Sequence, residues 1–210
     1  MKNGAITAVC LVVAVFVVIE VLRRMAANRY SRELTQDLLN ERYEEFNRKA
    51  QNRFVRYLLP PFNLDHLKLT AYLAQDRRED IDAQFERFAR CRLNREQKKA
   101  VYTKGFYYYL RTGNTEKVTH CYKELLEVLG GEEAEPLNRL YSVYVEKSDR
   151  YLPQILEELK RGPKERTAQC AALAAAMYAN RGEEEEAHRY YSLSMREQKE
   201  MMKGVLRTKE

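Results

Sequence analysis

The histidines and cysteines of this 210-residue chain are considered first, because these side chains commonly serve in acid–base, nucleophilic and metal chemistry. The three histidines, His66, His120 and His188, lie far apart, and none has a second histidine four residues along, which is the usual helical zinc-site spacing. His120 and Cys121 are adjacent. Successive residues of a helix point about 100° apart, however, so these two cannot pair as base and nucleophile. We therefore predict that the protein is not an enzyme and that it holds no metal and no cofactor.

The charged residues indicate solubility and helix capping. The run Glu183–Glu186 lies where a helix is expected to begin, and carboxylates there interact favourably with the positive end of the helix dipole. Over the whole chain, 37 basic and 31 acidic residues give a net charge of +6, but the two signs are interleaved at helical spacing. Nucleic-acid binding needs a basic patch, which this mixture does not provide, so we predict no nucleic-acid partner.

The longest apolar segment lies near the start of the chain. From Gly4 to Leu22 only Thr7 and Glu20 have polar side chains. Nineteen helical residues at ~1.5 Å each reach roughly 28 Å, which is close to the ~30 Å thickness of the hydrocarbon core of a bilayer. Glu20 lies in the last turn of the segment, where its carboxylate can reach the interface. We predict that residues 4–22 are a transmembrane anchor in contact with the lipid bilayer.

Two interpretations as a cleaved leader compete with the anchor. A signal peptide usually has an apolar core of only ~7–15 residues, and here Arg23 and Arg24 follow the segment directly. A lipoprotein signal would use Cys10, which lies in the middle of the segment behind the bulky Val9. Both interpretations fit the sequence less well than an anchor does.

Basic residues set the expected orientation of the anchor. The cations that follow it outnumber Lys2 and the amino terminus, and we expect them at the membrane interface: Arg23, Arg24, Arg29 and Arg32. Because basic flanks stay on the cytoplasmic side, we predict a single-pass cell-membrane protein whose C-terminal part is cytoplasmic. The three later cysteines agree with a reducing compartment, because they are odd in number and show no CxxC spacing.

Residues 30–58 contain neither proline nor glycine, and their apolar residues recur at steps of three and four. This pattern predicts one continuous amphipathic helix, which Pro60 and Pro61 end. We expect its apolar stripe, from Leu34 to Tyr57, to pack against the next helix. The alternative is a short coiled coil that joins two copies of the chain.

From about residue 62 the sequence repeats. Gly113 and Gly182 are 69 residues apart, and each has a tyrosine four residues before it and another nine residues after it. The same offsets place further turns near Asp76 and Lys147, so the turn positions are separated by 37, 34 and 35 residues. This spacing predicts four helix–turn–helix units. The alternative is an unrelated helical bundle whose hairpins have this length.

The repeat resembles the tetratricopeptide repeat family over about residues 62–200. The first and third units depart from the family because they lack the turn glycine, and Pro153 lies early in a second helix, where its missing amide is tolerated. The resemblance implies a right-handed α-solenoid of about four hairpins over these residues. Together with the transmembrane helix and the long helix predicted before it, this gives the expectation of an all-α protein. The expected domains are residues 4–22, 23–61, 62–200 and a tail, 201–210.

The resemblance also implies a groove lined by the first helices of successive units. The expected partner-binding residues in this groove are His66, Thr70, Thr103, Tyr107, Tyr141, Tyr144 and Gln169. Family members that hold a terminal carboxylate use cations at such positions, and none stands at these positions here, which argues against that mode. Tyrosines offer apolar area together with hydroxyls for a peptide backbone. The alternative is that they pack against the protein's own helices and fill the groove.

We therefore expect a membrane-tethered scaffold that docks a protein or peptide partner in this groove. Two other functions fit the same sequence. One is a structural protein that self-assembles as a homodimer through the Leu34–Tyr57 stripe. The other is a regulatory domain that binds a small molecule or a lipid.

Overall fold

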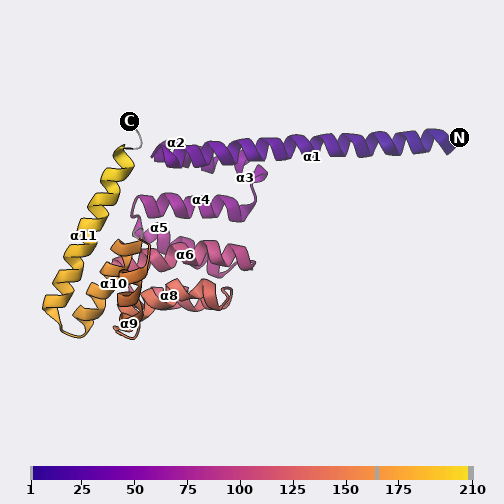
Figure 1. Cartoon of the computed structure of the whole chain (residues 1–210). Coiled ribbons are helices and arrows are strands. Elements are labelled where there is room, and N and C mark those ends of the chain that lie inside the picture. Colours follow the sequence, from indigo (N-terminus) through magenta and orange to yellow (C-terminus); the bar gives the residue numbers. More distant parts are fainter. Residues whose placement is uncertain (1, 164–165, 208–210) are drawn as a thin grey trace. The chain divides into compact units, whose positions relative to one another are not determined.

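The computed structural model describes the backbone of residues 2–163 and 166–207 and the side chains of residues 13–163 and 166–203 (Figure 1). Every regular element in this part of the chain is a helix, which confirms the prediction of an all-α protein. The chain divides into two compact units, residues 1–92 and 93–210, which we call the N-terminal unit and the C-terminal unit. The division lies inside residues 62–200, and the predicted domain limits stay predictions.

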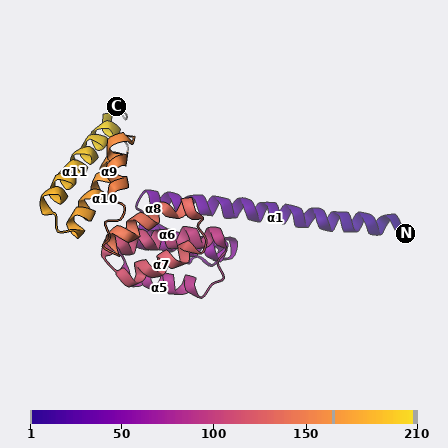
Figure 2. The same cartoon turned by 60° about the horizontal axis from the view of Figure 1, so that its bottom comes forward.

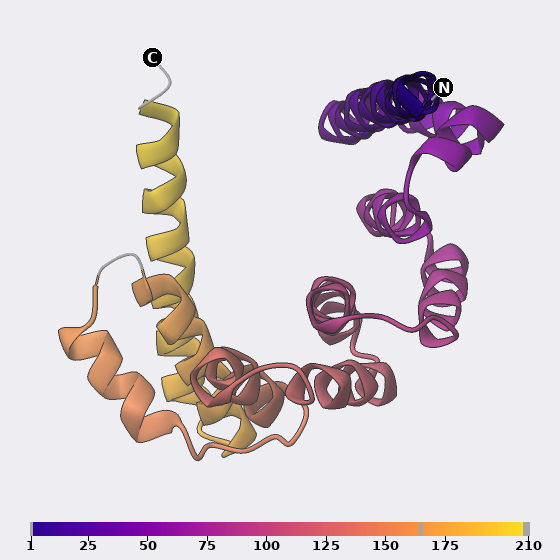
Figure 3. The same ribbon diagram turned by 90° about the vertical axis from the view of Figure 1, so that its right-hand side faces the viewer.

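The N-terminal unit contains α1 (Lys2–Leu39), α2 (Tyr43–Gln51), α3 (Arg53–Leu58), α4 (Pro61–Ala74) and α5 (Arg78–Ala89). Helices α2, α3 and α4 pack against α1, and α5 packs against α4 (Figures 1 and 3). The apolar core of this unit joins all of these helices except α5, and it consists of Leu34, Phe46, Ala50, Val55, Leu59, Leu64 and Ala71. Only the C-terminal half of α1 contributes to this core, so the preceding half extends beyond α2–α4 (Figure 1).

The prediction of one continuous helix over residues 30–58 is wrong. Helix α1 ends at Leu39, and Glu41 adopts a left-handed conformation with φ 56°. The amide of Arg42 then donates to the carbonyl of Asp37 at 2.8 Å, which closes a turn. A second break follows at Asn52, with φ −61° and ψ 127°. The apolar spacing does not reveal these breaks, because the short helices bury their apolar faces in the same core.

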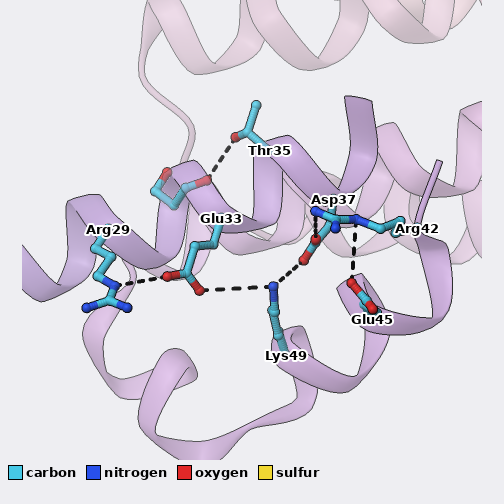
Figure 4. A network of polar contacts seen from close by, with 8 residues as sticks. Arg29, Glu33, Thr35, Asp37, Arg42, Glu45 and Lys49 are labelled. Carbon is cyan, nitrogen blue, oxygen red and sulfur yellow. Dashed lines mark hydrogen bonds and ion pairs between the residues drawn. The ribbon is translucent and has the colours of Figure 1, made fainter. Parts of the chain in front are cut away.

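A buried carboxylate joins α1 to α2. The side chain of Asp37 is fully buried, and its Oδ1 lies 2.8 Å from Nη2 of Arg42. Its Oδ2 accepts a hydrogen bond of 2.6 Å from Nζ of Lys49 on α2. Glu33 and Glu45 flank this group at 4.0 Å from Lys49 and 3.5 Å from Arg42 respectively (Figure 4). Because two cations neutralise the buried charge, its desolvation is compensated.

The C-terminal unit contains α6 (Arg95–Thr112), α7 (Thr115–Leu126), α8 (Gly131–Tyr144), α9 (Leu152–Arg161), α10 (Thr167–Asn180) and α11 (Glu184–Arg207). Helix α6 pairs with α7, and α10 packs against both α9 and α11 (Figure 2). Helix α10 is rich in alanine, and half of its side chains are buried, because small side chains let helices approach closely on several sides. This helix is the centre of the unit's second half.

The four predicted turn positions are confirmed. Asp76, Gly113, Lys147 and Gly182 all have left-handed backbone conformations, with φ of 51°, 72°, 56° and 78° respectively. Each lies between two helices: α4 and α5, α6 and α7, α8 and α9, α10 and α11. A left-handed residue after the last helical turn lets the chain reverse, and glycine does this without steric cost. The period of about 35 residues therefore corresponds to four successive helix–turn–helix segments.

The third segment differs from the others in its packing. Its second helix, α9, packs mainly against α10 and less against α8 (Figure 2). The connection between α8 and α9 runs from Val145 to Tyr151, which is longer than the connections in the other three segments. The α8–α9 segment is therefore more open than a closed hairpin, and a regular right-handed solenoid stays a prediction.

The predicted anchor, residues 4–22, belongs to α1. The side chains of residues 4–12 lie outside the part that the structure describes. Among the described residues, no helix has both the length and the apolar character that a membrane crossing requires.

Candidate partner-binding site

Two of the predicted groove residues lie on α4 in the N-terminal unit. The side chain of His66 is half-buried and stacks on the ring of Phe62, with the ring centroids 5.7 Å apart. The hydroxyl of Thr70 donates to the carbonyl of His66 at 3.0 Å. Both side chains are therefore engaged with neighbours on their own helix.

Two more of the predicted groove residues, Thr103 and Tyr107, lie on α6 in the C-terminal unit. A capping box starts this helix: the side chain of Asn94 accepts from the amide of Gln97, whose side chain accepts from the amide of Asn94. Thr103 is half-buried, whereas Tyr107 is 49% exposed. The ring of Tyr107 meets that of the buried Phe106 edge to face, with centroids 5.6 Å apart. Tyr107 thus presents about half of its side chain on the surface.

Of the two predicted groove tyrosines on α8, one packs between helices and the other is exposed. Tyr141 stacks on Tyr122 of α7 with centroids 4.0 Å apart, and its hydroxyl lies 3.0 Å from that of Thr119. Tyr141 therefore helps to pack α7 against α8. Tyr144 is 37% exposed, and burial of the rest of its ring raises the pKa of its hydroxyl, so the phenol stays neutral. Tyr107 and Tyr144 are thus the two exposed members of the predicted tyrosine set.

Gln169, on α10, lines a cavity of about 330 Å³ between α8, α9 and α10, which we call the α8–α10 cleft. Its lining consists of Glu132, Glu135, Pro136, Arg139, Leu140, Ile155, Glu158, Arg166, Gln169, Cys170 and Leu173. Helices α8 and α10 are the first helices of the third and fourth segments, so this cleft lies between two helices predicted to line the groove.

Arg139 is the centre of the polar wall of the α8–α10 cleft. Its Nε donates to Glu135 at 3.1 Å, and its Nη1 donates to Glu158 of α9 at 2.7 Å. Burial alone would lower the pKa of Arg139, but the hydrogen bonds to the two carboxylates outweigh that effect and raise it. The guanidinium also lies over the ring of Tyr151, 5.9 Å from its centroid. Arg139 is therefore held rigidly between α8 and α9.

Cys170 lines the same wall, and its thiol contacts Glu158. Its thiol donates to the second carboxylate oxygen of Glu158, with Sγ and Oε2 3.7 Å apart. Burial, and then the negative charge of Glu158, raise the pKa of Cys170, so the thiol stays protonated at neutral pH. Among the described residues, no group of three or more His, Cys, Asp or Glu side chains could hold a metal ion.

Sequence reasoning missed Arg139, Glu158 and Cys170. The Glu135–Arg139 spacing of four residues on one helix was a readable signal for an ion pair. The role of Glu158 could not be predicted from the sequence, because it depends on the packing of α9 against α10. The open third segment is what creates the α8–α10 cleft.

The four predicted interface arginines all have exposed side chains on α1. Arg23 and Arg24 share the carboxylate of Glu20, with N–O distances of 2.8 and 3.0 Å. Arg29 pairs with Glu33 at 2.9 Å, and Arg32 points to the surface. They follow directly on the exposed apolar side chains that end at Leu22.

Comparison of the chain with family models, with curated proteins and with solved structures finds no similar protein.

Proposed function

We propose that the protein is a membrane-tethered, tetratricopeptide-like scaffold that docks a segment of a protein partner in the α8–α10 cleft. The observation that carries this proposal is the cleft itself, which opens between two helices that the repeat assigns to the binding groove and which includes the predicted residue Gln169. Exposed Tyr144 stands on the same helix as Arg139, one helical turn beyond Leu140.

The lining suits a peptide better than an apolar ligand. Polar and charged side chains alternate with apolar ones such as Leu140 and Leu173, so the cleft offers hydrogen bonds as well as apolar contacts. Arg139 and Glu158 already neutralise each other, so a partner would not need to supply a charge to match them. Tyr144, one helical turn beyond the lining residue Leu140, would add rigid contact area at a low entropic cost.

The tether in this proposal is the first part of α1. Its described apolar side chains from Val13 to Leu22 are 49–70% exposed, including Phe16 at 70% and Leu22 at 60%. A helix that is apolar on all sides is typical of a membrane span. The arginines that follow favour an orientation with the C-terminal part in the cytoplasm.

Photo-crosslinking in intact cells tests the docking. We expect a photoreactive phenylalanine at position 169 to capture a discrete adduct, and the same group at the exposed Glu157, which does not line the cleft, to capture none. Tyr144→Ala should reduce the adduct, whereas Tyr191→Ala, at a side chain 58% exposed on α11, should leave it unchanged. Equal labelling at positions 169 and 157, or no adduct at position 169, contradicts the proposal.

Membrane attachment is tested separately. The full chain should remain in the membrane fraction after alkaline carbonate extraction, and a tag at its C-terminus should be protected from external protease in intact cells. Release by carbonate contradicts the anchor, and digestion of the tag contradicts the orientation.

Part of the surface that the homodimer alternative requires is buried within the protein itself. Leu34, Phe46 and Ala50 of the stripe are between 0 and 2% exposed inside the N-terminal unit, so they are not available to a second copy. Only Leu39, Phe54 and Tyr57 of the stripe stay exposed. Light scattering on the detergent-solubilised protein is expected to give the mass of a monomer.

A further inference from the structure

A second cavity, of about 280 Å³, lies in the N-terminal unit between α1 and the connection from α3 to α4. We call it the α1–α4 cavity. It is lined by Arg23, Arg24, Ala27, Asn28, Ser31, Leu58, Leu59, Pro60 and Asn63. The docking proposal makes no use of it, since it lies in a different unit from the α8–α10 cleft.

The chemistry of the α1–α4 cavity favours an anion. Arg23 and Arg24 line the end of it nearest the start of the chain, and no acidic side chain occurs among the described residues that line it. Both arginines pair with a single carboxylate, Glu20, so the three groups together keep one net positive charge. Asn28, Ser31 and Asn63 add hydrogen-bonding groups along the wall. Guanidinium groups match the oxygens of a phosphate particularly well.

The place of the cavity along α1 indicates the source of the anion. This step rests on the proposed membrane tether, in which the apolar segment ends at Leu22. The headgroup layer adds roughly 5–8 Å to each side of the ~30 Å hydrocarbon core. From Arg23 to Ala27 the helix rises by about 6 Å, so this end of the cavity would lie at the depth of the lipid phosphates.

We propose that the α1–α4 cavity binds the headgroup of an anionic phospholipid. Arg23 and Arg24 hold the lipid phosphate, and the polar groups of Asn28, Ser31 and Asn63 contact the rest of the headgroup. The connection between α3 and α4 lines the cavity opposite α1. A bound lipid would then fix the N-terminal unit against the membrane surface.

Native mass spectrometry of the full chain in detergent tests this inference, with phosphatidylglycerol and phosphatidylcholine as probes. We expect the protein to retain phosphatidylglycerol in preference. Arg24→Gln should weaken that binding about fivefold, the contribution of one cation near an anionic surface. Arg48→Gln removes the same charge from an exposed position on α2 that does not line the cavity, and it should have little effect. Asn28→Phe fills the cavity from an exposed position, keeps every charge, and should abolish the preference.

Each contrary outcome has a distinct meaning. Equal losses for Arg24→Gln and Arg48→Gln would show a general attraction between charges and would overturn the site. Displacement of the lipid by inorganic phosphate at matching concentration would show a phosphate site instead of a lipid site. A protein that resists carbonate extraction but shows no headgroup preference refutes this inference and leaves the tether standing, whereas release by carbonate refutes the tether.

Discussion

Two kinds of residue occupy the same left-handed backbone conformation at the four turns. Gly113 and Gly182 adopt it without steric cost, whereas Asp76 and Lys147 adopt it despite their Cβ atoms. The sequence pattern identified the two glycine turns directly, and it reached the other two only by counting the period. Counting succeeded because the repeat fixes where a chain reversal must occur, whichever residue supplies it.

Substitutions at these turns should separate backbone strain from packing. A Cβ at position 113 would meet no atom within 4 Å, so Gly113→Ala should cost about 1 kcal/mol of the free energy of unfolding, through backbone conformation alone. Gly131→Ala, where a Cβ also has open space but φ is ordinary for an L-residue, should be neutral or slightly stabilising. Urea unfolding followed by circular dichroism measures both changes. Equal effects of the two substitutions would refute the strain argument.

The thiols should differ in reactivity. Burial raises the pKa of Cys121 to about 12, and it also raises that of Cys170, whereas Cys91 is exposed. We expect iodoacetamide at pH 8 to modify Cys91 rapidly, and the other two thiols only after denaturation, as read by peptide mass spectrometry. Because the pKa of Cys121 is higher in the folded state, its contribution to stability is complete below about pH 9 and is lost as the pH rises towards 12. Rapid native labelling of Cys121 would contradict this.

At the scale of elements, the break between α1 and α2 shows what periodicity cannot reveal. The apolar steps of three and four continue across Asn40 and Glu41, and neither proline nor glycine marks the turn. The turn is stabilised by contacts between helices, above all by Asp37 with Lys49. The pattern within this segment therefore predicted the buried positions Leu34, Phe46 and Ala50 correctly, but in α3 Val55 and Leu58 are buried while Phe54 and Tyr57 are exposed. It also predicted the number of helices incorrectly.

Removing the buried carboxylate should loosen this pair of helices. Asp37→Ala leaves Arg42 and Lys49 without their shared partner, and because both cations reach solvent in part, we expect a cost of about 2 kcal/mol, below that of a fully buried pair. Glu45→Ala, which removes an exposed carboxylate 3.5 Å from Arg42, should cost less than about 0.5 kcal/mol. Thermal unfolding of the full chain compares the two. A smaller loss for Asp37→Ala than for Glu45→Ala would be inconsistent with this role.

The candidate site also contains some features that the sequence predicts and others that depend on how the helices pack. Gln169 could be placed beside α8 from the repeat register alone, because first helices of successive units are neighbours in the family. The contact of Arg139 with Glu158 could not be placed in this way, because α9 packs mainly against α10. Tyr141 was predicted as a groove residue, and its ring stacks on Tyr122, so aromatic character alone does not distinguish packing from binding.

At the scale of the whole molecule, each unit has a core of its own. In the C-terminal unit, Val143, Ile155, Leu173 and Met177 are buried together, and all of them come from α8, α9 and α10. The segment between α5 and α6 consists of only five residues, Arg90–Asn94, with exposed side chains at Arg90, Cys91 and Arg92. This arrangement favours folding of the C-terminal unit as an independent domain.

Expression of residues 93–210 alone tests that independence. We expect a helical protein with a single cooperative urea transition, because the fragment contains a buried apolar core of its own, formed by α8, α9 and α10. Native trypsin digestion of the full chain should release a similar fragment by cleavage at Arg90 or Arg92. A fragment that is soluble but unfolds without cooperativity would show that the unit needs the rest of the chain.

Helix α1 continues without interruption from Val13 to Leu34, the residue that enters the core of the N-terminal unit. If the tether is correct, this continuous helix is a rigid connection instead of a flexible linker. It places Leu34 about 18 Å from Leu22 along the helix axis. One residue inserted between them would turn the N-terminal unit by about 100° about the helix axis and lift it by ~1.5 Å. The number of residues between Leu22 and Leu34 therefore sets the direction, around the helix axis, in which the rest of the N-terminal unit faces along the membrane surface.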